Sequence, residues 1–340
     1  MDKNSSKVFF YKGLRKIQNS LYFFFFIIAL LVFSYLARDN FSEEEADYSI
    51  YSMSYDTNIL PDSPRGLEIK YGYRLFIETS QMLGVKSKEN PYVGNALSCN
   101  NCHLNAGTQA FAIPLIGVNK RFPQYRGREN KTGSLEERIN GCFERSMNGK
   151  NLKENSKEMK ALLAYMNWLG RYVKEDEIIN GKGLLKINYP DRAVNLINGK
   201  QVFDKHCVEC HGEDGQGEKI DNYTFMYPPL WGSNSYNNGA GMTRVLTAAM
   251  FIKYNMPQGT TFDNPVLTDE ESYDVAGYIN QQLRPAKLNL EADFPIREKK
   301  PMSTPYPPYA DSFSQTQHQL GPFKPIFEYY KKNYNIEKNK

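Results

Sequence analysis

The sequence predicts a mainly α-helical protein in which two similar domains follow one another, with long loops and an extended C-terminal tail. Two observations predict this arrangement. The pattern Cys-x-x-Cys-His occurs at Cys99–His103 and again at Cys207–His211. Each copy follows a segment of helical periodicity and precedes a loop and a further helical segment. This repeated order is typical of two cytochrome c-like haem domains in tandem.

The repeated motif has the spacing needed for covalent attachment of a c-type haem. Each thiol can form a thioether with one vinyl group of the haem, and the adjoining histidine reaches the iron from the same face. Two copies use four of the chain's five cysteines, so chance is a poor explanation. The alternative, a zinc ion held by four cysteines, needs no histidine after each pair. We therefore expect two covalently bound haems on Cys99, Cys102, His103, Cys207, Cys210 and His211.

The composition is that of an ordinary globular protein. The chain of 340 residues is long enough for two domains, and its hydrophobic and charged fractions are 41% and 24%. The net charge of +4 is small, and no basic stripe is interleaved with aromatic residues. These features argue against nucleic acid as a partner.

Residues 1–37 have the pattern of an export signal or a membrane anchor. Five positively charged residues precede the uncharged, apolar run 21–37, whose length is within the range of a membrane span. Ala37 could mark a cleavage site, but Tyr35 is bulky where cleavage favours a small residue, so we favour an uncleaved anchor. The positive flank would stay in the cytoplasm. The body of the protein would then lie in the bacterial periplasm, tethered to the inner membrane.

The first haem domain is predicted over 65–180, after a polar linker at 38–64. A linker with glycines and a proline at 181–192 separates it from the second domain at 193–288. Residues 289–340 are rich in proline and tyrosine and show little periodicity, so we expect them to form the extended tail.

Helices are predicted by apolar spacings near four residues and by capping residues at their starts. In the first domain Ser134 and Glu137 have the spacing of a capping box. In the second, Thr268 precedes acidic residues that suit a first helical turn. The predicted helices cover 66–83, 134–147 and 156–173 in the first domain and 195–206, 242–255 and 269–283 in the second.

The iron of each haem needs a second ligand, or leaves that position open for chemistry. For the second haem Met256 is the favoured candidate, because it ends a predicted helix and Pro257 stops that helix. A methionine that only fills a gap in the core is the general alternative. Three other methionines lie between His211 and Met256, namely Met226, Met242 and Met250.

Cys142 is the candidate for the second ligand of the first haem. It is the cysteine that the two motifs leave over, and no further histidine lies between His103 and the linker. A thiolate is a strong iron ligand, and Arg138 and Arg145 would lower the pKa of the thiol beside them. The alternatives are a buried, inert thiol and ligation by Met147.

Four stretches of the chain have the pattern of one known family: 137–149, 227–242, 255–257 and 317–326. The stretch around Cys142 is the most specific, because few cytochromes carry a cysteine there. Together the stretches span both haem domains and the tail, and they resemble the di-haem thiosulfate dehydrogenase and tetrathionate reductase family. The resemblance implies a reaction that interconverts two thiosulfate ions with one tetrathionate ion and two electrons.

The resemblance also implies the iron ligands, which are His103 with Cys142 at the first haem and His211 with Met256 at the second. The first haem would be the active site, and the second would exchange electrons with an external carrier such as a small cytochrome or a quinol-linked system. Arg128 and Ser146 match active-site positions, and Arg126 is a weaker neighbour. Some members carry lysine where this chain has Asn255, and they can exchange ligands on reduction. That exchange is not expected here unless Lys253 reaches the iron.

Positive charge near the active site makes physical sense, because two thiosulfate dianions must be brought together. Arginine gives planar, multi-donor contacts to sulfonate oxygens. Arg126, Arg128 and Arg145 are the candidates, with surface or haem-propionate pairing as the alternative. Ser146 could donate a hydrogen bond to substrate or cap local backbone. We also hypothesise that Cys142 leaves the iron and forms a covalent sulfur adduct with a thiosulfate fragment.

Two other functions fit parts of the pattern. A non-catalytic di-haem electron-transfer cytochrome would need neither Cys142 nor clustered arginines. A di-haem peroxidase fits the duplicated domains, but nothing else in the chain points to it.

Overall fold

The computed structural model describes residues 3–39, 46–84, 91–175, 177–221 and 224–338. The chain divides into two units, Met1–Asp47 and Tyr48–Lys340. The first unit holds α1 (Lys3–Asp39), in which Phe10–Phe33 is long and apolar enough to cross a membrane and is not buried. A signal sequence and a membrane anchor share these properties, so α1 fits either.

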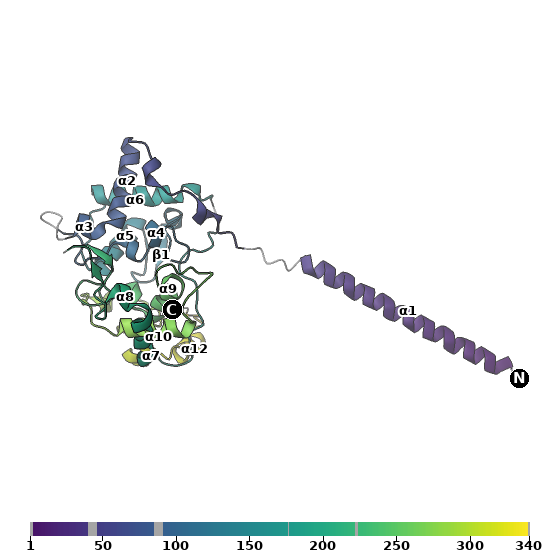
Figure 1. The fold of residues 1–340 in the computed structure, drawn as a ribbon. Coiled ribbons are helices and arrows are strands. Elements are labelled where there is room, and N and C mark those ends of the chain that lie inside the picture. The colour runs from purple at the N-terminus through teal and green to yellow at the C-terminus, as the bar shows by residue number, and fades with distance from the viewer. Residues whose placement is uncertain (1–2, 40–45, 85–90, 176, 222–223, 339–340) are drawn as a thin grey trace. The chain divides into compact units, whose positions relative to one another are not determined.

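The first half of the second unit is a helical domain (Figure 1) with a large hydrophobic core. Its elements are η1 (Ser49–Ser52), η2 (Thr57–Ile59), α2 (Pro64–Ile77), α3 (Thr79–Leu83), η3 (Cys99–Asn101), α4 (Leu104–Gly107), η4 (Val118–Arg121), β1 (Gln124–Arg126), β2 (Lys131–Gly133), α5 (Leu135–Arg145), α6 (Lys157–Leu169) and η5 (Gly170–Tyr172). Helices α2 and α6 cross at Gly72, where an added Cβ would lie 1.9 Å from the carbonyl oxygen of Ala161. Only glycine permits this close approach.

The second half repeats the same crossing around a second core. Its elements are α7 (Leu196–His206), α8 (Val208–His211), β3 (Glu218–Lys219), β4 (Phe225–Tyr227), η6 (Gly241–Thr243), α9 (Val245–Asn255), α10 (Asp269–Asn280), η7 (Leu290–Ala292), η8 (Arg297–Lys299), α11 (Gln315–Leu320) and α12 (Lys324–Tyr334). Helices α7 and α10 meet at Gly199, where an added Cβ would lie 2.2 Å from the carbonyl oxygen of Asp274. In both halves a helix on the N-terminal side of the motif therefore crosses a helix on its C-terminal side at a glycine.

The capping residues mark helix starts as predicted. The Ser134 hydroxyl accepts a hydrogen bond from the N–H of Glu137, whose carboxylate accepts one from the N–H of Ser134. Thr268 and Glu271 form the same reciprocal pair at the start of α10. These local contacts satisfy backbone donors that a helix start would otherwise leave unpaired.

The helix predicted over 66–83 is divided into α2 and α3 by Glu78, which has non-helical backbone angles. Among the apolar residues spaced near four apart in this segment, Leu75 and Leu83 are buried. Leu67 is 51% exposed, whereas Ile69 and Phe76 are buried. The contact of Gly72 with α6 fixes the rotation of α2, and that rotation leaves Leu67 on the outside.

Two segments that were predicted to be irregular are packed into the domains. Within the predicted linker 38–64, Ile50 and Thr57 are buried and the Tyr51 hydroxyl donates to the carbonyl of Asn180 at 2.9 Å. The predicted tail is partly helical rather than extended throughout, because α12 buries Ile326 and Tyr330 in the second core.

The predicted loop after the first motif also contains short regular structure. Its end forms β1, which pairs antiparallel with β2 in the register Arg126↔Lys131. A second antiparallel pair, β3 with β4, lies between the second motif and α9. The hairpin of β1 and β2 positions Arg126 next to α5: an added Cβ at Gly141 would lie 3.1 Å from the Arg126 Nη2.

Candidate haem sites and active-site cavity

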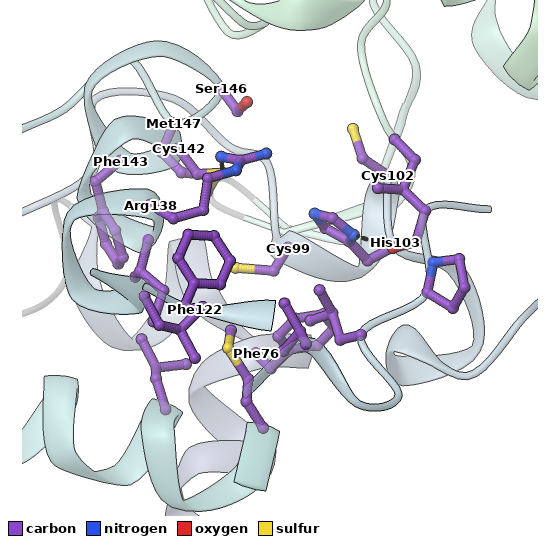
Figure 2. Close-up of a pocket in the computed structure, with 18 of the residues that line it drawn as sticks. Phe76, Cys99, Cys102, His103, Phe122, Arg138, Cys142, Phe143, Ser146 and Met147 are labelled. Carbon is purple, nitrogen blue, oxygen red and sulfur yellow. Dashed lines mark hydrogen bonds between the residues drawn. The ribbon is translucent and has the colours of Figure 1, made fainter. Parts of the chain in front are cut away.

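The first motif lines a cavity in the first domain (Figure 2). The cavity encloses about 1070 Å³ of non-atom space, open solvent included. Cys99, Cys102 and His103 form part of its lining, and Cys142 and Ser146 contribute from α5 and its C-terminal end. The remaining lining is mostly apolar and includes Phe76, Leu97, Leu135, Ile139, Phe143 and Leu162.

Both motif histidines have one ring nitrogen occupied by a backbone carbonyl. The Nδ1 of His103 lies 2.6 Å from the Ile113 oxygen, and the Nδ1 of His211 lies 2.8 Å from the Pro228 oxygen. A carbonyl can only accept, so each Nδ1 carries the proton and each Nε2 is left for a metal. Burial also lowers the pKa of His211 and so favours the neutral form that can bind a metal. The Pro228 hydrogen bond acts in the opposite direction but has the smaller effect.

Cys142 has the electrostatic surroundings of a thiolate. The Nη1 of Arg138 donates to its Sγ at 2.7 Å. Burial alone would raise the pKa of the thiol, but the charge of Arg138 and the contacts with His103 lower that pKa to about 6. By contrast, burial raises the pKa of Cys99 to about 12. The two kinds of cysteine in this cavity therefore differ in chemistry, as a thioether-forming thiol and an ionised ligand or nucleophile would.

The residues of this cavity fit a c-type haem. Two thiols and a histidine whose Nε2 is not held by a backbone carbonyl lie beside an apolar space, and Cys142 supplies a further sulfur donor to the same space. Met147, the alternative donor, also lines the cavity and is 2% exposed. In the described part of the chain no three His, Cys, Asp or Glu residues are placed to hold a metal ion together, so the four-cysteine zinc alternative has no support.

The three predicted arginines are held by carboxylates near the cavity rather than in its lining. Arg128 pairs with Asp293, and Arg145 donates to the other oxygen of Asp293 at 2.8 Å. Arg126 pairs with Glu129 at 2.8 Å. The arginines that do line the cavity are Arg121 and Arg138.

Arg138 is therefore a functional candidate in its own right. The sequence predicted only a charge near Cys142, whereas in the structure Arg138 is the hydrogen-bond donor to the sulfur. The signal was present, because residues four apart on a helix lie side by side, and Arg138 and Cys142 have this spacing on α5. Ser146 lies in the lining as expected, and its carbonyl accepts from the Asn95 side chain at 2.8 Å.

The second motif lies where α7 ends, against the second core. Cys207, Met242 and Met256 all pack on this core. Met256 directly follows α9 with an extended backbone, as expected of a residue that leaves a helix before a proline. Met226 is 57% exposed, whereas Met250 is buried and lines a separate cavity with Tyr189 and Phe327.

Lys253 and Asn255, which precede Met256, both have other hydrogen-bond partners. The ammonium of Lys253 donates to the carbonyl of Leu267 and lies 3.5 Å from a carboxylate oxygen of Asp269. Asn255 is 3% exposed and hydrogen-bonds to residues of the first domain. Neither side chain is placed to replace Met256.

Fold and sites together define a di-haem c-type cytochrome. Residues 89–174 match the SoxA/TsdA cytochrome c domain, and residues 196–282 match the cytochrome c family. The thiosulfate dehydrogenase of Psychrobacter arcticus is 39% identical over 243 residues, which cover 71% of this chain and 70% of that protein. The chain belongs to the thiosulfate dehydrogenase family.

Other relatives agree. The thiosulfate dehydrogenase of Allochromatium vinosum is 39% identical over 231 residues, which cover 67% of this chain and 82% of that protein. Among solved structures, the thiosulfate dehydrogenase (TsdBA) of Marichromatium purpuratum aligns with a TM-score of 0.62 and 35% identity over 69% of this chain. This chain spans about half the length of that solved chain (50%). These matches confirm the prediction of two tandem cytochrome c domains with two covalently bound haems.

Proposed function

We propose that this protein joins two thiosulfate ions into tetrathionate in the bacterial periplasm, releases two electrons, and can run the same reaction in reverse. The observation that carries the proposal is the Arg138–Cys142 pair at 2.7 Å, in the cavity that also contains the first haem-attachment motif. A plain electron carrier has no need for an activated cysteine there. The relatives named thiosulfate dehydrogenase, at 37–39% identity, support the same substrate.

The proposed chemistry centres on the Cys142 sulfur. Each haem, when attached, accepts one electron, so the pair takes both electrons of the reaction. The Cys142 thiolate forms a bond to the outer sulfur of one thiosulfate, and the loss of two electrons leaves Cys142–S–S–SO₃⁻. A second thiosulfate then attacks that outer sulfur, the bond to Cys142 breaks, and tetrathionate leaves with the thiolate restored. Cys142 is also the proposed second iron ligand, so it must leave the metal before it attacks.

The cavity residues support these steps. The guanidinium of Arg138 stabilises the thiolate before attack and again when tetrathionate departs. Arg121 and Ser146 lie in the same lining and can donate hydrogen bonds to sulfonate oxygens. Arg128 and Arg145, which share the carboxylate of Asp293, would help to position α5 and would add positive charge near the cavity.

The second haem is proposed to exchange electrons with an external carrier. His211 and Met256 would be its iron ligands, because a His/Met pair suits electron transfer and raises the reduction potential. The apolar helix α1 would tether the chain to the inner membrane and keep the haem domains in the periplasm.

The test is made on the haem-loaded full-length protein in detergent, chemically reduced and kept without oxygen. Tetrathionate should reoxidise the haems rapidly, as followed by visible absorption, and thiosulfate should reduce the oxidised protein. Cys142→Ala should slow both reactions by roughly 10⁴-fold or more, as for other enzymes that lose a nucleophile. Cys142→Ala with unchanged rates would remove the cysteine from the mechanism. A parent protein that reacts with neither anion would be an electron-transfer cytochrome.

A further inference from the structure

Arg244 is a half-buried cation that forms no salt bridge with any described residue. It lies immediately before α9, and its Nε donates to the Thr247 hydroxyl at 3.4 Å. In the described chain no carboxylate oxygen is within 4.0 Å of its guanidinium. Arg128 and Arg145, by contrast, each pair with a carboxylate. Nothing in the proposed chemistry above uses Arg244.

The nearby negative charge is already taken by other arginines. Asp293 gives one carboxylate oxygen to Arg128 and the other to Arg145, and it also accepts from the Tyr306 hydroxyl at 2.7 Å. Burial lowers the pKa of Arg244 to about 10, and the positive charge of Arg128 is the next largest cause. The cluster of Arg128, Arg145 and Arg244 thus holds more positive charge than Asp293 can balance, even with Glu144 beside Arg145.

This cluster lies where the two haem domains meet. The N–H of Phe294 donates to the carbonyl of Arg128 at 2.8 Å, and the N–H of Asn237 donates to the carbonyl of Arg145 at 3.1 Å. The chain that leads into α9 therefore lies against α5, which carries Cys142. Arg244 contributes its charge from the second domain, whereas Arg128 and Arg145 contribute theirs from the first.

We propose that Arg244, with Arg128 beside it, binds an oxyanion at the junction of the two haem domains. A guanidinium withdrawn from water needs a compensating anion, and its planar fork matches the two oxygens of a carboxylate or a sulfonate. Two sources carry that chemistry: a propionate of an attached haem, and the sulfonate end of a thiosulfate ion. The sulfonate source rests on the proposed function, whereas the carboxylate source needs only haem attachment.

The experiment compares Arg244→Gln and Arg244→Lys with the parent, all as haem-loaded full-length protein. The first readout is the reduction potential of each haem between pH 5 and 8. The second is the dissociation constant of thiosulfate for the fully reduced protein, which can accept no further electrons and so binds without turnover. Arg65→Gln, at a 57% exposed side chain, is the matched control.

A propionate partner predicts that Arg244→Gln lowers one haem potential and makes it depend on pH, because the released carboxylate then takes up a proton. A sulfonate partner predicts unchanged potentials and a thiosulfate dissociation constant raised roughly 10-fold or more, the effect of losing a charged hydrogen bond. Arg244→Lys keeps the charge without the fork and should give the smaller change of the same kind. Potentials and dissociation constant both at parent values would overturn the proposal.

A further variant, Thr247→Val, distinguishes a loss of anion binding from a general loss of the fold. This variant removes the acceptor of the Arg244 Nε and keeps the guanidinium. It should reproduce part of the Arg244→Gln effect in a protein with normal haem content. Because neither readout needs turnover, a protein that fails to oxidise thiosulfate would still report on the haem-propionate source.

Discussion

Gln109 of the first haem domain donates a hydrogen bond to Asn255 of the second, with 2.8 Å between Nε2 and Oδ1. Asn255 directly precedes Met256, the proposed ligand of the second iron. Four residues after Gln109, the carbonyl of Ile113 holds the Nδ1 of His103 at 2.6 Å. One short segment therefore contacts both the histidine of the first motif and the last residue of α9 in the second domain.

Gln109→Ala should destabilise the protein by about 1–3 kcal/mol, because it leaves the buried Oδ1 of Asn255 unpaired. Denaturant unfolding of the haem-loaded protein measures this change. Gln81→Ala is the matched control, since Gln81 also donates across the domains, to Thr224 at 2.9 Å, but at a more exposed place. An equal loss of unfolding free energy in both variants would mean that the Gln109–Asn255 hydrogen bond contributes no more than an exposed one.

Gly72→Ala and Gly199→Ala should each cost roughly 3 kcal/mol or more and lower the haem content of the domain concerned. The added methyl group would lie 1.9 Å and 2.2 Å from backbone oxygens, so the helices must move apart. Thermal unfolding and haem absorbance measure the effects. Gly127→Ala, with nothing within 4 Å of the added atom, should be nearly neutral. A neutral Gly199→Ala would contradict the described crossing.

Local features of the sequence were sufficient for the motifs and the helix starts, because a capping side chain such as Ser134 contacts residues only three positions away. The partner of Arg128 was not predictable in this way, since Asp293 lies 165 residues further along the chain. The exposed position of Leu67 likewise follows from a distant contact, that of Gly72 with α6. Pairings of this kind depend on the fold rather than on sequence spacing.

The C-terminal helix was missed for a different reason. Buried Ile326 and Tyr330 are four residues apart, which is a helical spacing, but they stand in a segment whose many prolines and tyrosines favour an extended reading. Pro325 in fact lies in the first turn of α12, where proline is tolerated. The proline content alone therefore gave the wrong prediction, because proline favours a helix in its first turn and disrupts one in its interior.

Phe323→Ala should destabilise the second haem domain by about 3–5 kcal/mol, because Phe323 is fully buried in its core just before α12. Unfolding followed at each haem would show the loss in the second domain. Phe327→Ala, at a partly buried position, is the control and should cost less. Intact stability after loss of Phe323 would show that the C-terminal region contributes little to the second core.

Asp293→Asn should destabilise the protein by roughly 3 kcal/mol at pH 7, because it leaves Arg128 and Arg145 without their shared carboxylate. Burial alone would raise the pKa of Asp293, but the two arginines hold it below its usual value. A lowered carboxyl pKa stabilises the fold above the unfolded pKa of about 4, and this contribution is lost as the pH falls toward the folded pKa.

The stability difference between parent and Asp293→Asn should therefore narrow as the pH drops below about 4. Chemical unfolding between pH 3 and 7 measures it. Asp62→Asn, which removes an 80% exposed partner of Lys70, should change stability little at any pH. A difference that stays constant down to pH 3 would show that the carboxylate charge is not what stabilises this junction.

Met256→Ala should lower the reduction potential of the second haem and abolish the charge-transfer absorption typical of a methionine–iron bond, with the first haem unchanged. The reason is that a thioether ligand raises the potential of a histidine-ligated haem, and Met256 follows α9 with an extended backbone that frees its side chain. Met226→Ala, at a 57% exposed position, should leave both signals intact. Met242 packs on the same core as Met256, so loss of the absorption in Met242→Ala and its survival in Met256→Ala would transfer the ligand role to Met242.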